Sequence, residues 1–165
     1  DLYIKASQKK LLGKYDDALK LYEQLLKANE VNPAVHHDMA RIYHAMDKKE
    51  SAVSSARKAV KYDESNPWYL LTLAQIYEES IEPGLAADVL KKVINISPHQ
   101  DLYQRWAIAL DQAGNKKEAI QAYDQADQKY GWSEDRSDSK VDLYLALKME
   151  KEANKEVEKW VGQVL

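Results

Sequence analysis

Residues 40–52 read Ala-Arg-Ile-Tyr-His-Ala-Met-Asp-Lys-Lys-Glu-Ser-Ala. Apolar residues return at helical intervals on both sides of a polar break near Asp47, which is typical of two helices joined by a short turn. The two alanines that bound this stretch each belong to a column of small residues that recurs along the chain. One column holds Ala18, Ala52, Ala86, Ala119 and Ala153, and the other holds Ala6, Ala40, Ala74, Ala107 and Val141.

Successive members of each column are 33 or 34 residues apart, and the two columns stay 12 residues apart. A repeat of this length is one supersecondary unit that cannot bury its own apolar face, so copies stack into a continuous core. Alanine is needed where paired helices approach closely, because a larger side chain would overpack the contact by about 1–3 kcal/mol. The sequence therefore predicts an all-α fold, an α-solenoid of tandem antiparallel helix pairs with ten helices and no strand.

Proline and glycine mark the ends of the predicted units. A capping side chain precedes proline at Asn32-Pro33, Asn66-Pro67 and Ser97-Pro98, which is the usual chemistry of a helix start. Residues that end helices are expected in or beside the turn within each pair. These are Gly13, Asp47, Pro83 with Gly84, Gly114 and Lys148. We predict a single domain with repeats at about 1–32, 33–66, 67–99, 100–133 and 134–165.

The columns also carry aromatic residues at fixed offsets. Ala40 is followed by Tyr43 and Ala74 by Tyr77, and the run Gly13-Lys-Tyr-Asp-Asp-Ala is followed by Tyr22. Gly114, Ala119 and Tyr123 repeat the second pattern. In these features the chain resembles the tetratricopeptide-repeat family. The resemblance implies a right-handed superhelix whose first helices line a concave groove, and it implies a protein-binding scaffold rather than an enzyme.

Projecting the repeat onto that groove predicts the side chains that line it. The partner-binding candidates are Tyr3, Ser7, Lys10, His37, Arg41, His44, Trp68, Leu71, Gln75, Glu78, Gln104, Ile108, Asp111, Asp138 and Asp142. Read in order, these residues are basic, then apolar with an aromatic, then acidic, which favours a peptide of opposite polarity. Arg41 and His44 would meet its acidic end, and Glu78 and Asp111 its basic end. Trp68 has an alternative interpretation, in which its ring packs near Tyr62.

Charge and composition limit the class of partner. The net charge is −3, with 12 Lys and Arg against 8 Asp and Glu in residues 1–62 (net +4) and 12 against 19 in residues 63–165 (net −7). A nucleic-acid binder normally shows a basic stripe, so we expect no nucleic-acid partner. A solvated surface with unevenly placed lysines explains the asymmetry equally well.

Motifs of catalysis and cofactor binding are missing from the chain. We find no glycine-rich phosphate loop, no His-Glu-x-x-His, no serine elbow and no calcium loop. Cysteine is absent, which excludes disulfides and thiolate metal sites. His37 and His44 share a helix face but lie about 10 Å apart, too far to hold one metal ion. We therefore expect no enzyme activity, no cofactor and no metal site, and we expect His36 on the packed side.

The C-terminal segment supports a second hypothesis from a different class. An apolar stripe runs through Val157, Trp160, Val161, Val164 and Leu165, whereas the last helix of a solenoid should present a polar outer face. The chain is thus alternatively a self-associating unit, a homodimer through this helix, or a segment of a longer solenoid. A regulatory domain attached to a catalytic region elsewhere is a third alternative.

The sequence leaves the compartment open. No apolar run approaches the roughly 18 residues of a membrane-spanning helix, so we expect a soluble portion, cytoplasmic or in the cell envelope. The sequence opens at Asp1, already inside the first predicted helix, so we expect a fragment that lacks its native N-terminus.

Overall fold

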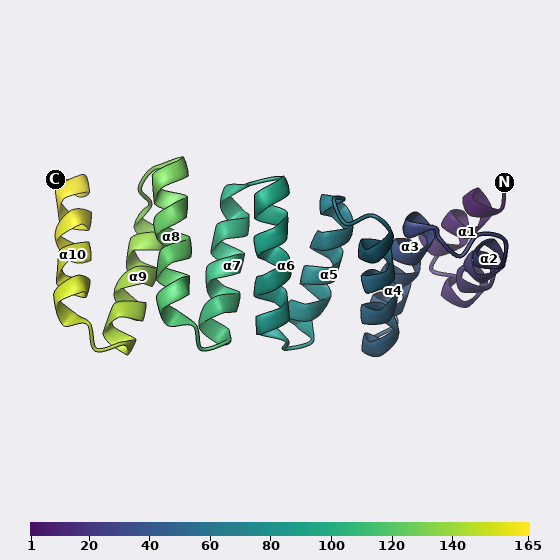
Figure 1. The fold of residues 1–165 in the computed structure, drawn as a ribbon, viewed down its shortest axis with the longest axis horizontal. Coiled ribbons are helices and arrows are strands. Elements are labelled where there is room, and N and C mark those ends of the chain that lie inside the picture. The colour runs from purple at the N-terminus through teal and green to yellow at the C-terminus, as the bar shows by residue number, and fades with distance from the viewer. The chain divides into compact units, whose positions relative to one another are not determined.

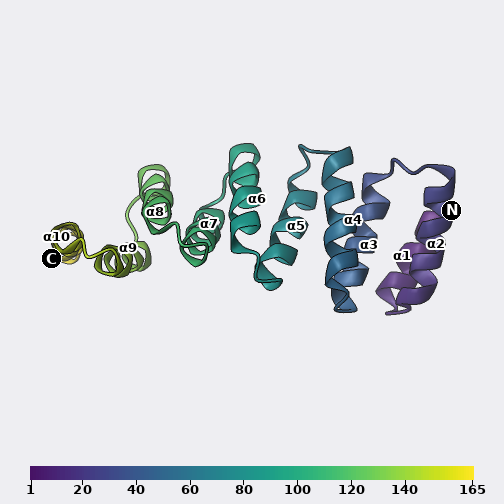
Figure 2. The same cartoon turned by 60° about the horizontal axis from the view of Figure 1, so that its bottom comes forward.

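The computed structural model describes all 165 residues and contains ten α-helices and no strand. Among α1 to α5, and again among α6 to α10, consecutive helices run antiparallel (Figures 1 and 2). Their bounds are α1 Leu2–Leu11, α2 Tyr15–Ala28, α3 Pro33–Ala45, α4 Lys49–Tyr62, α5 Pro67–Glu79, α6 Pro83–Ile96, α7 Gln100–Gln112, α8 Lys116–Tyr130, α9 Glu134–Ala146 and α10 Glu150–Val164. The predicted number and type of elements are confirmed.

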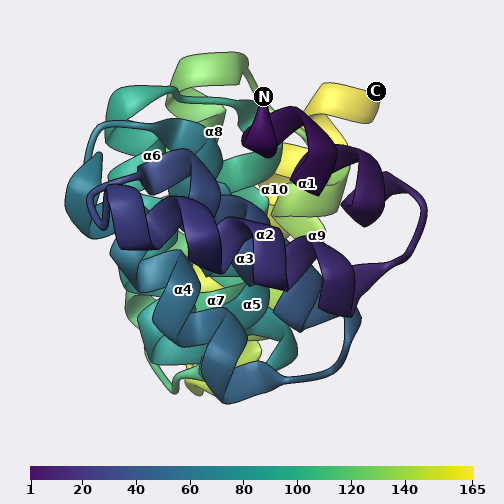
Figure 3. The ribbon, with the colours of Figure 1, turned by 90° about the vertical axis from the view of Figure 1, so that its right-hand side faces the viewer.

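The chain divides into two compact units, which we describe separately. Unit 1 spans Asp1–Glu82 and holds α1 to α5, and unit 2 spans Pro83–Leu165 and holds α6 to α10. Within unit 1, α1 packs on α2, α3 on α4, and α4 on α5. Figure 3 views unit 1 from the side of α1, with α1 and α2 nearest the viewer. Within unit 2, α6 packs on α7, α7 on α8, and α9 on α10.

Both alanine columns are buried, as the repeat predicts. The nine alanines of the two columns expose at most 2% of their surface, and Val141 is half-buried. In unit 1, Ala6 and Ala18 belong to an apolar cluster that includes Leu19, Tyr22 and Ile42. The buried alanines leave room for close approach of the helices that pack together within each unit.

The caps and turns follow the local sequence. The side chains of Asn32 and Asn66 accept hydrogen bonds from the backbone N–H groups of Val35 and Trp68, which fixes the starts of α3 and α5. Each turn within a pair contains one residue in the left-handed conformation, and these are Gly13, Asp47, Ile81, Gly114 and Lys148. In the third turn this residue is Ile81, whereas Pro83 and Gly84 begin α6.

Candidate functional site

Asp38 of α3 is the centre of a polar cluster formed by side chains of α1, α2 and α3. Its Oδ2 accepts hydrogen bonds from the Tyr3 hydroxyl (2.7 Å) and the Tyr22 hydroxyl (2.9 Å). Lys10 donates to Oδ1 of the same carboxylate. Ser7 lies 3.1 Å from the Tyr22 hydroxyl. Three of the predicted groove residues, Tyr3, Ser7 and Lys10, are therefore tied into the contact between repeats.

The cluster changes the acidity of its members. Burial alone raises the pKa of Asp38, but hydrogen bonds from Lys10 and Tyr3 more than offset it, so that the pKa lies below its ordinary value. Burial and the hydrogen bond to Asp38 raise the pKa of Tyr3 to about 12. Asp38 therefore stays ionised and both tyrosines stay protonated at neutral pH.

The histidines of α3 are also engaged. His37 Nε2 lies 2.8 Å from the Thr72 hydroxyl, and its ring packs 4.9 Å from the ring of Tyr69. His44 Nε2 lies 2.6 Å from Glu79 Oε2. The pKa of Glu79 is lowered by its hydrogen bond with Gln75 and, to a smaller extent, by its hydrogen bond with His44. Of the residues predicted to make this end of the groove basic, Lys10 and His44 therefore each contact a carboxylate within unit 1.

His36 lies on the packed side, as the sequence indicates. It is buried beside Tyr62, with 5.5 Å between ring centroids, and its Nε2 lies 3.1 Å from the Glu30 carbonyl oxygen. Burial lowers its pKa, so the ring is neutral at pH 7. The structure contains no group of three or more His, Cys, Asp or Glu side chains placed to hold a metal ion.

Three predicted residues of unit 1 remain available for contact with a partner. Trp68 exposes 71% of its surface at the start of α5, and Leu71 lies one turn later, half-buried. The Trp68 ring therefore lies in solvent and is not packed against Tyr62. Arg41 is exposed on α3 and has no ion pair in the structure. An indole, an aliphatic side chain and a guanidinium form the open part of the unit 1 face.

In unit 2 a pocket of about 370 Å³ opens between α7, α8 and α9. Its apolar lining comes from Ala107, Ile108, Leu143 and Ala146, and its polar lining from Asp111, Lys116, Tyr123, Ser139 and Asp142. The sequence predicted Ile108, Asp111 and Asp142 as groove residues. It did not predict Lys116, Tyr123 and Ser139, because projecting the repeat onto one helix face does not show which side chains of neighbouring helices come together. Gln104 and Asp138 are exposed on the same first helices.

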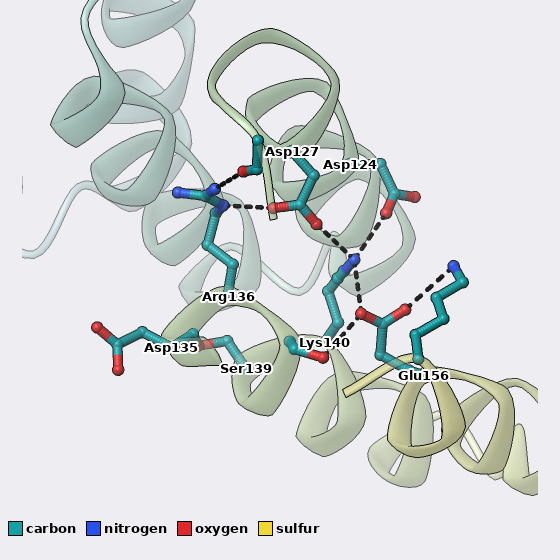
Figure 4. Close-up of polar contacts among 10 residues, drawn as sticks. Asp124, Asp127, Asp135, Arg136, Ser139, Lys140 and Glu156 are labelled. Atoms are coloured by element: carbon teal, nitrogen blue, oxygen red, sulfur yellow. Dashed lines mark hydrogen bonds and ion pairs between the residues drawn. The ribbon is translucent and has the colours of Figure 1, made fainter. Parts of the chain in front are cut away.

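A buried ionic cluster joins α8, α9 and α10 (Figure 4). Lys140 Nζ contacts Asp124 Oδ1 at 3.1 Å, Asp127 Oδ2 at 2.8 Å and Glu156 Oε1 at 2.9 Å. Arg136 Nε contacts Asp127 Oδ1 at 2.6 Å. The sequence places Lys140 and Ser137 where other repeats bury apolar residues. These polar residues at apolar positions are the sequence feature that indicates a buried polar cluster. They do not reveal which carboxylates form ion pairs with Lys140.

The stripe on α10 is exposed along much of its length. Val157, Val161, Val164 and Leu165 are exposed and Trp160 is half-buried. Together with Glu134 they line a shallow cavity of about 480 Å³. None of the ten helices combines the length and the hydrophobicity that a membrane-spanning helix requires.

Part of the sequence matches a known family. Residues 11–54 match the family model of the tetratricopeptide repeat. A comparison with curated proteins gives no match. The matched family is a repeat family and not a catalytic one.

Solved structures with the same fold cover nearly the whole chain. A crystal structure of MamA is 22% identical over 95% of this chain and 92% of its own, with a TM-score of 0.72, and a second MamA crystal structure is 22% identical over 93% and 85%, with a TM-score of 0.73. YrrB, a TPR protein with an unusual peptide-binding site, is 14% identical over 96% and 82%, with a TM-score of 0.76. The α-solenoid class predicted from the alanine columns is confirmed. The chain of ten helices therefore shares the fold of these solved structures, and its residues 11–54 match the tetratricopeptide repeat.

Proposed function

We propose that this chain is a non-enzymatic protein-interaction scaffold that binds a peptide or protein segment on the faces of its first helices. The observation that carries the proposal is the exposure of Trp68 on α5, one turn before Leu71, together with the exposure of Arg41 on α3. Tryptophan and arginine are enriched among the residues that dominate binding energy at protein interfaces. An exposed indole with an aliphatic neighbour is also costly to leave in water unless a partner covers it.

The charges favour an acidic and apolar segment on unit 1. Lys10 and His44 each contact a carboxylate, Asp38 and Glu79 respectively, whereas the exposed Arg41 has no ion pair and supplies the open positive charge of this face. An acidic side chain near Arg41 and an apolar side chain on Trp68 would satisfy both groups. Of the basic side chains that the sequence predicts on this face, only the guanidinium of Arg41 is thus left to pair with a partner.

A peptide-array screen with wild type, Arg41→Glu and Trp68→Ala tests the proposal, followed by titration of every peptide that binds. Trp68→Ala should speed dissociation and cost about 2 kcal/mol or more of binding free energy. Arg41→Glu should slow association and weaken its dependence on salt. Arg57→Glu on α4 is the matched control, because Arg57 is an exposed arginine of the second-helix side. A peptide that binds both test variants as tightly as wild type would exclude this face.

A second function, self-association, is favoured by the stripe on α10. One repeat before Val157 and Trp160, the corresponding residues of α8 are Tyr123 and Ala126, which are buried. The α10 face thus continues a surface that a neighbouring helix covers in the preceding pair. We propose that a second copy of α10 covers it in a homodimer.

Light scattering over a range of concentrations tests the homodimer. Wild type should associate with increasing concentration, and Trp160→Glu should abolish the association because it places a charge in the apolar contact. Lys155→Glu, at an exposed position of the same helix, should leave it intact. A protein that stays monomeric at every concentration contradicts the homodimer. No observation favours the regulatory-domain alternative.

A further inference from the structure

The repeat places Lys10, His44 and Asp111 at one equivalent position, near the end of a first helix. His44 follows Lys10 by one repeat, and Asp111 follows it by three. Asp38 and Ser139 are likewise equivalent positions on the helix that follows. The junctions between successive first helices can therefore be compared within one molecule.

In unit 1 a basic side chain of one first helix meets a carboxylate of the next at both junctions. Lys10 of α1 donates to Asp38 of α3. His44 of α3 lies 2.6 Å from Glu79 of α5. Each of these carboxylates therefore has a polar partner on a neighbouring first helix of the chain itself.

The junction between α7 and α9 in unit 2 is built differently. Asp111 stands at the position equivalent to Lys10, and Ser139 stands at the position equivalent to Asp38. Neither helix therefore supplies a cation at these two positions. The space is instead the open pocket of about 370 Å³. It has an apolar wall, to which Ile108 and Leu143 contribute, and carboxylates at Asp111 and Asp142.

The charges in this pocket are incompletely matched. Lys116 at the start of α8 pairs with Asp111. Asp142 has no ion pair in the structure, and Asp138 is exposed one turn before it on α9. Tyr123 is buried beside the pocket, where burial raises the pKa of its hydroxyl, so this group stays neutral and able to hydrogen-bond. The pocket therefore carries a net negative charge next to apolar surface.

We propose that this pocket binds a lysine or arginine side chain of the partner segment. The alkyl stem would lie on Ile108 and Leu143, and the cationic end would meet Asp142, with Asp111 and the Ser139 hydroxyl close by. The partner thereby supplies at this junction the cation that Lys10 supplies within unit 1. This inference rests on the proposed function, because it names the side-chain class that the unit 2 face accepts.

NMR titration of the ¹⁵N-labelled protein with Nα-acetyl-lysine methylamide tests the pocket directly. The matched probe is Nα-acetyl-norleucine methylamide, which has a similar alkyl chain without the ammonium group. The lysine probe should shift the amide signals of residues 107–111 and 139–146 in a saturable way. Loss of one charge-assisted contact weakens binding about tenfold. We expect this loss for the norleucine probe and for Asp142→Asn with the lysine probe.

Two further variants sharpen the test. Glu150→Gln removes an exposed carboxylate of α10 and should bind the lysine probe as wild type does. The double variant Asp111→Lys with Ser139→Asp restores the cation–anion pair of unit 1 and should abolish binding while the circular dichroism spectrum stays helical. Equal affinity for the two probes, wild-type affinity in Asp142→Asn, or shifts confined to other residues would each overturn the inference.

The titration is independent of any partner, so it separates the two proposals. A peptide array that yields no binder, together with lysine binding at the pocket, would refute the proposed function alone. A peptide that needs Trp68 but is indifferent to Asp142→Asn would refute only the pocket.

Discussion

Lys140 Nζ lies 2.9 Å from Glu156 Oε1, and both side chains are at most 4% exposed. Lys140 occupies the position that Met39, Leu73 and Trp106 fill in the three preceding repeats, where each is buried. In the fifth pair, ion pairs among α8, α9 and α10 thus replace apolar packing. A buried ion pair is strongly destabilised when one partner is removed, because the other is left uncompensated.

Lys140→Met should therefore destabilise the protein even though methionine suits this position in another repeat. It leaves Glu156 and Asp127 without their common cation, and we expect a loss of about 3–5 kcal/mol of unfolding free energy, measured by urea denaturation. The double variant Lys140→Met with Glu156→Leu should be more stable than Lys140→Met alone, because the buried carboxylate is removed as well.

Lys159→Met is the control for these variants. Lys159 Nζ lies 3.5 Å from Glu156 Oε2 but is largely exposed, so its loss should change stability by less than about 1 kcal/mol. If Lys140→Met were as stable as wild type, the cluster would not hold the fifth pair.

The same cluster predicts how stability depends on pH. Burial alone raises the pKa of Glu156, but hydrogen bonds from Lys140 and Ser137 outweigh it, so the pKa lies below its ordinary value. Its contribution is therefore present above the unfolded pKa of about 4.3 and is lost as pH falls through the lower, folded value. Burial alone lowers the pKa of Lys140, but hydrogen bonds to Asp127 and Glu156 outweigh it, so the pKa lies above its ordinary value. That contribution is present below about pH 10.4 and is lost as pH rises through the folded pKa.

Melting temperatures of wild type and Glu156→Gln at a series of pH values check this. The variant should be less stable at neutral pH, and the gap between the two proteins should narrow on acidification below about pH 4. The pKa of Asp38 is also lowered. Because wild type and Glu156→Gln both contain Asp38, its titration does not change the difference between their melting temperatures. A gap that is constant across the acidic range would show that Glu156 does not titrate as inferred.

The fold could be predicted from the sequence because its strongest constraint is steric and local. An alanine is needed at each close approach of paired helices, and its spacing alone locates Ala40, Ala74 and the others in the core. Caps such as Asn66 then fix where the helices begin. The left-handed residue of the third turn, Ile81, was not predicted, because a β-branched residue seldom adopts positive φ.

The candidate site was predictable only in part. Helical projection correctly indicated that Trp68 and Arg41 are exposed, because direction follows from periodicity. It could not show that Asp38 meets Lys10 or that Glu79 meets His44, since those contacts depend on how helices one repeat apart are spaced. The pocket beside Asp142 could not be predicted either, because its size depends on how side chains of α7, α8 and α9 pack together.

Asp38→Asn tests the polar cluster of unit 1. Asparagine keeps one acceptor oxygen but removes the charge that Lys10 and the two tyrosines contact, so we expect a loss of about 2–3 kcal/mol in urea denaturation. Tyr3→Phe, which removes one hydrogen bond of the same cluster, should cost about 1 kcal/mol. If Asp38→Asn cost no more than Tyr3→Phe, the carboxylate would not be the centre of the cluster.

Ala74→Leu tests the steric basis of the whole fold. Ala74 of α5 is completely buried, so the three added carbons would have to displace atoms packed around it. We expect overpacking to cost about 1–3 kcal/mol and to lower the melting temperature measured by circular dichroism, while the spectrum stays helical. Ala45→Leu is the matched control, because Ala45 is exposed at the end of α3 and the same change there should alter stability by about 0.5 kcal/mol or less. An unchanged melting temperature in Ala74→Leu would mean that the alanine columns are not the close contacts that set the spacing of the paired helices.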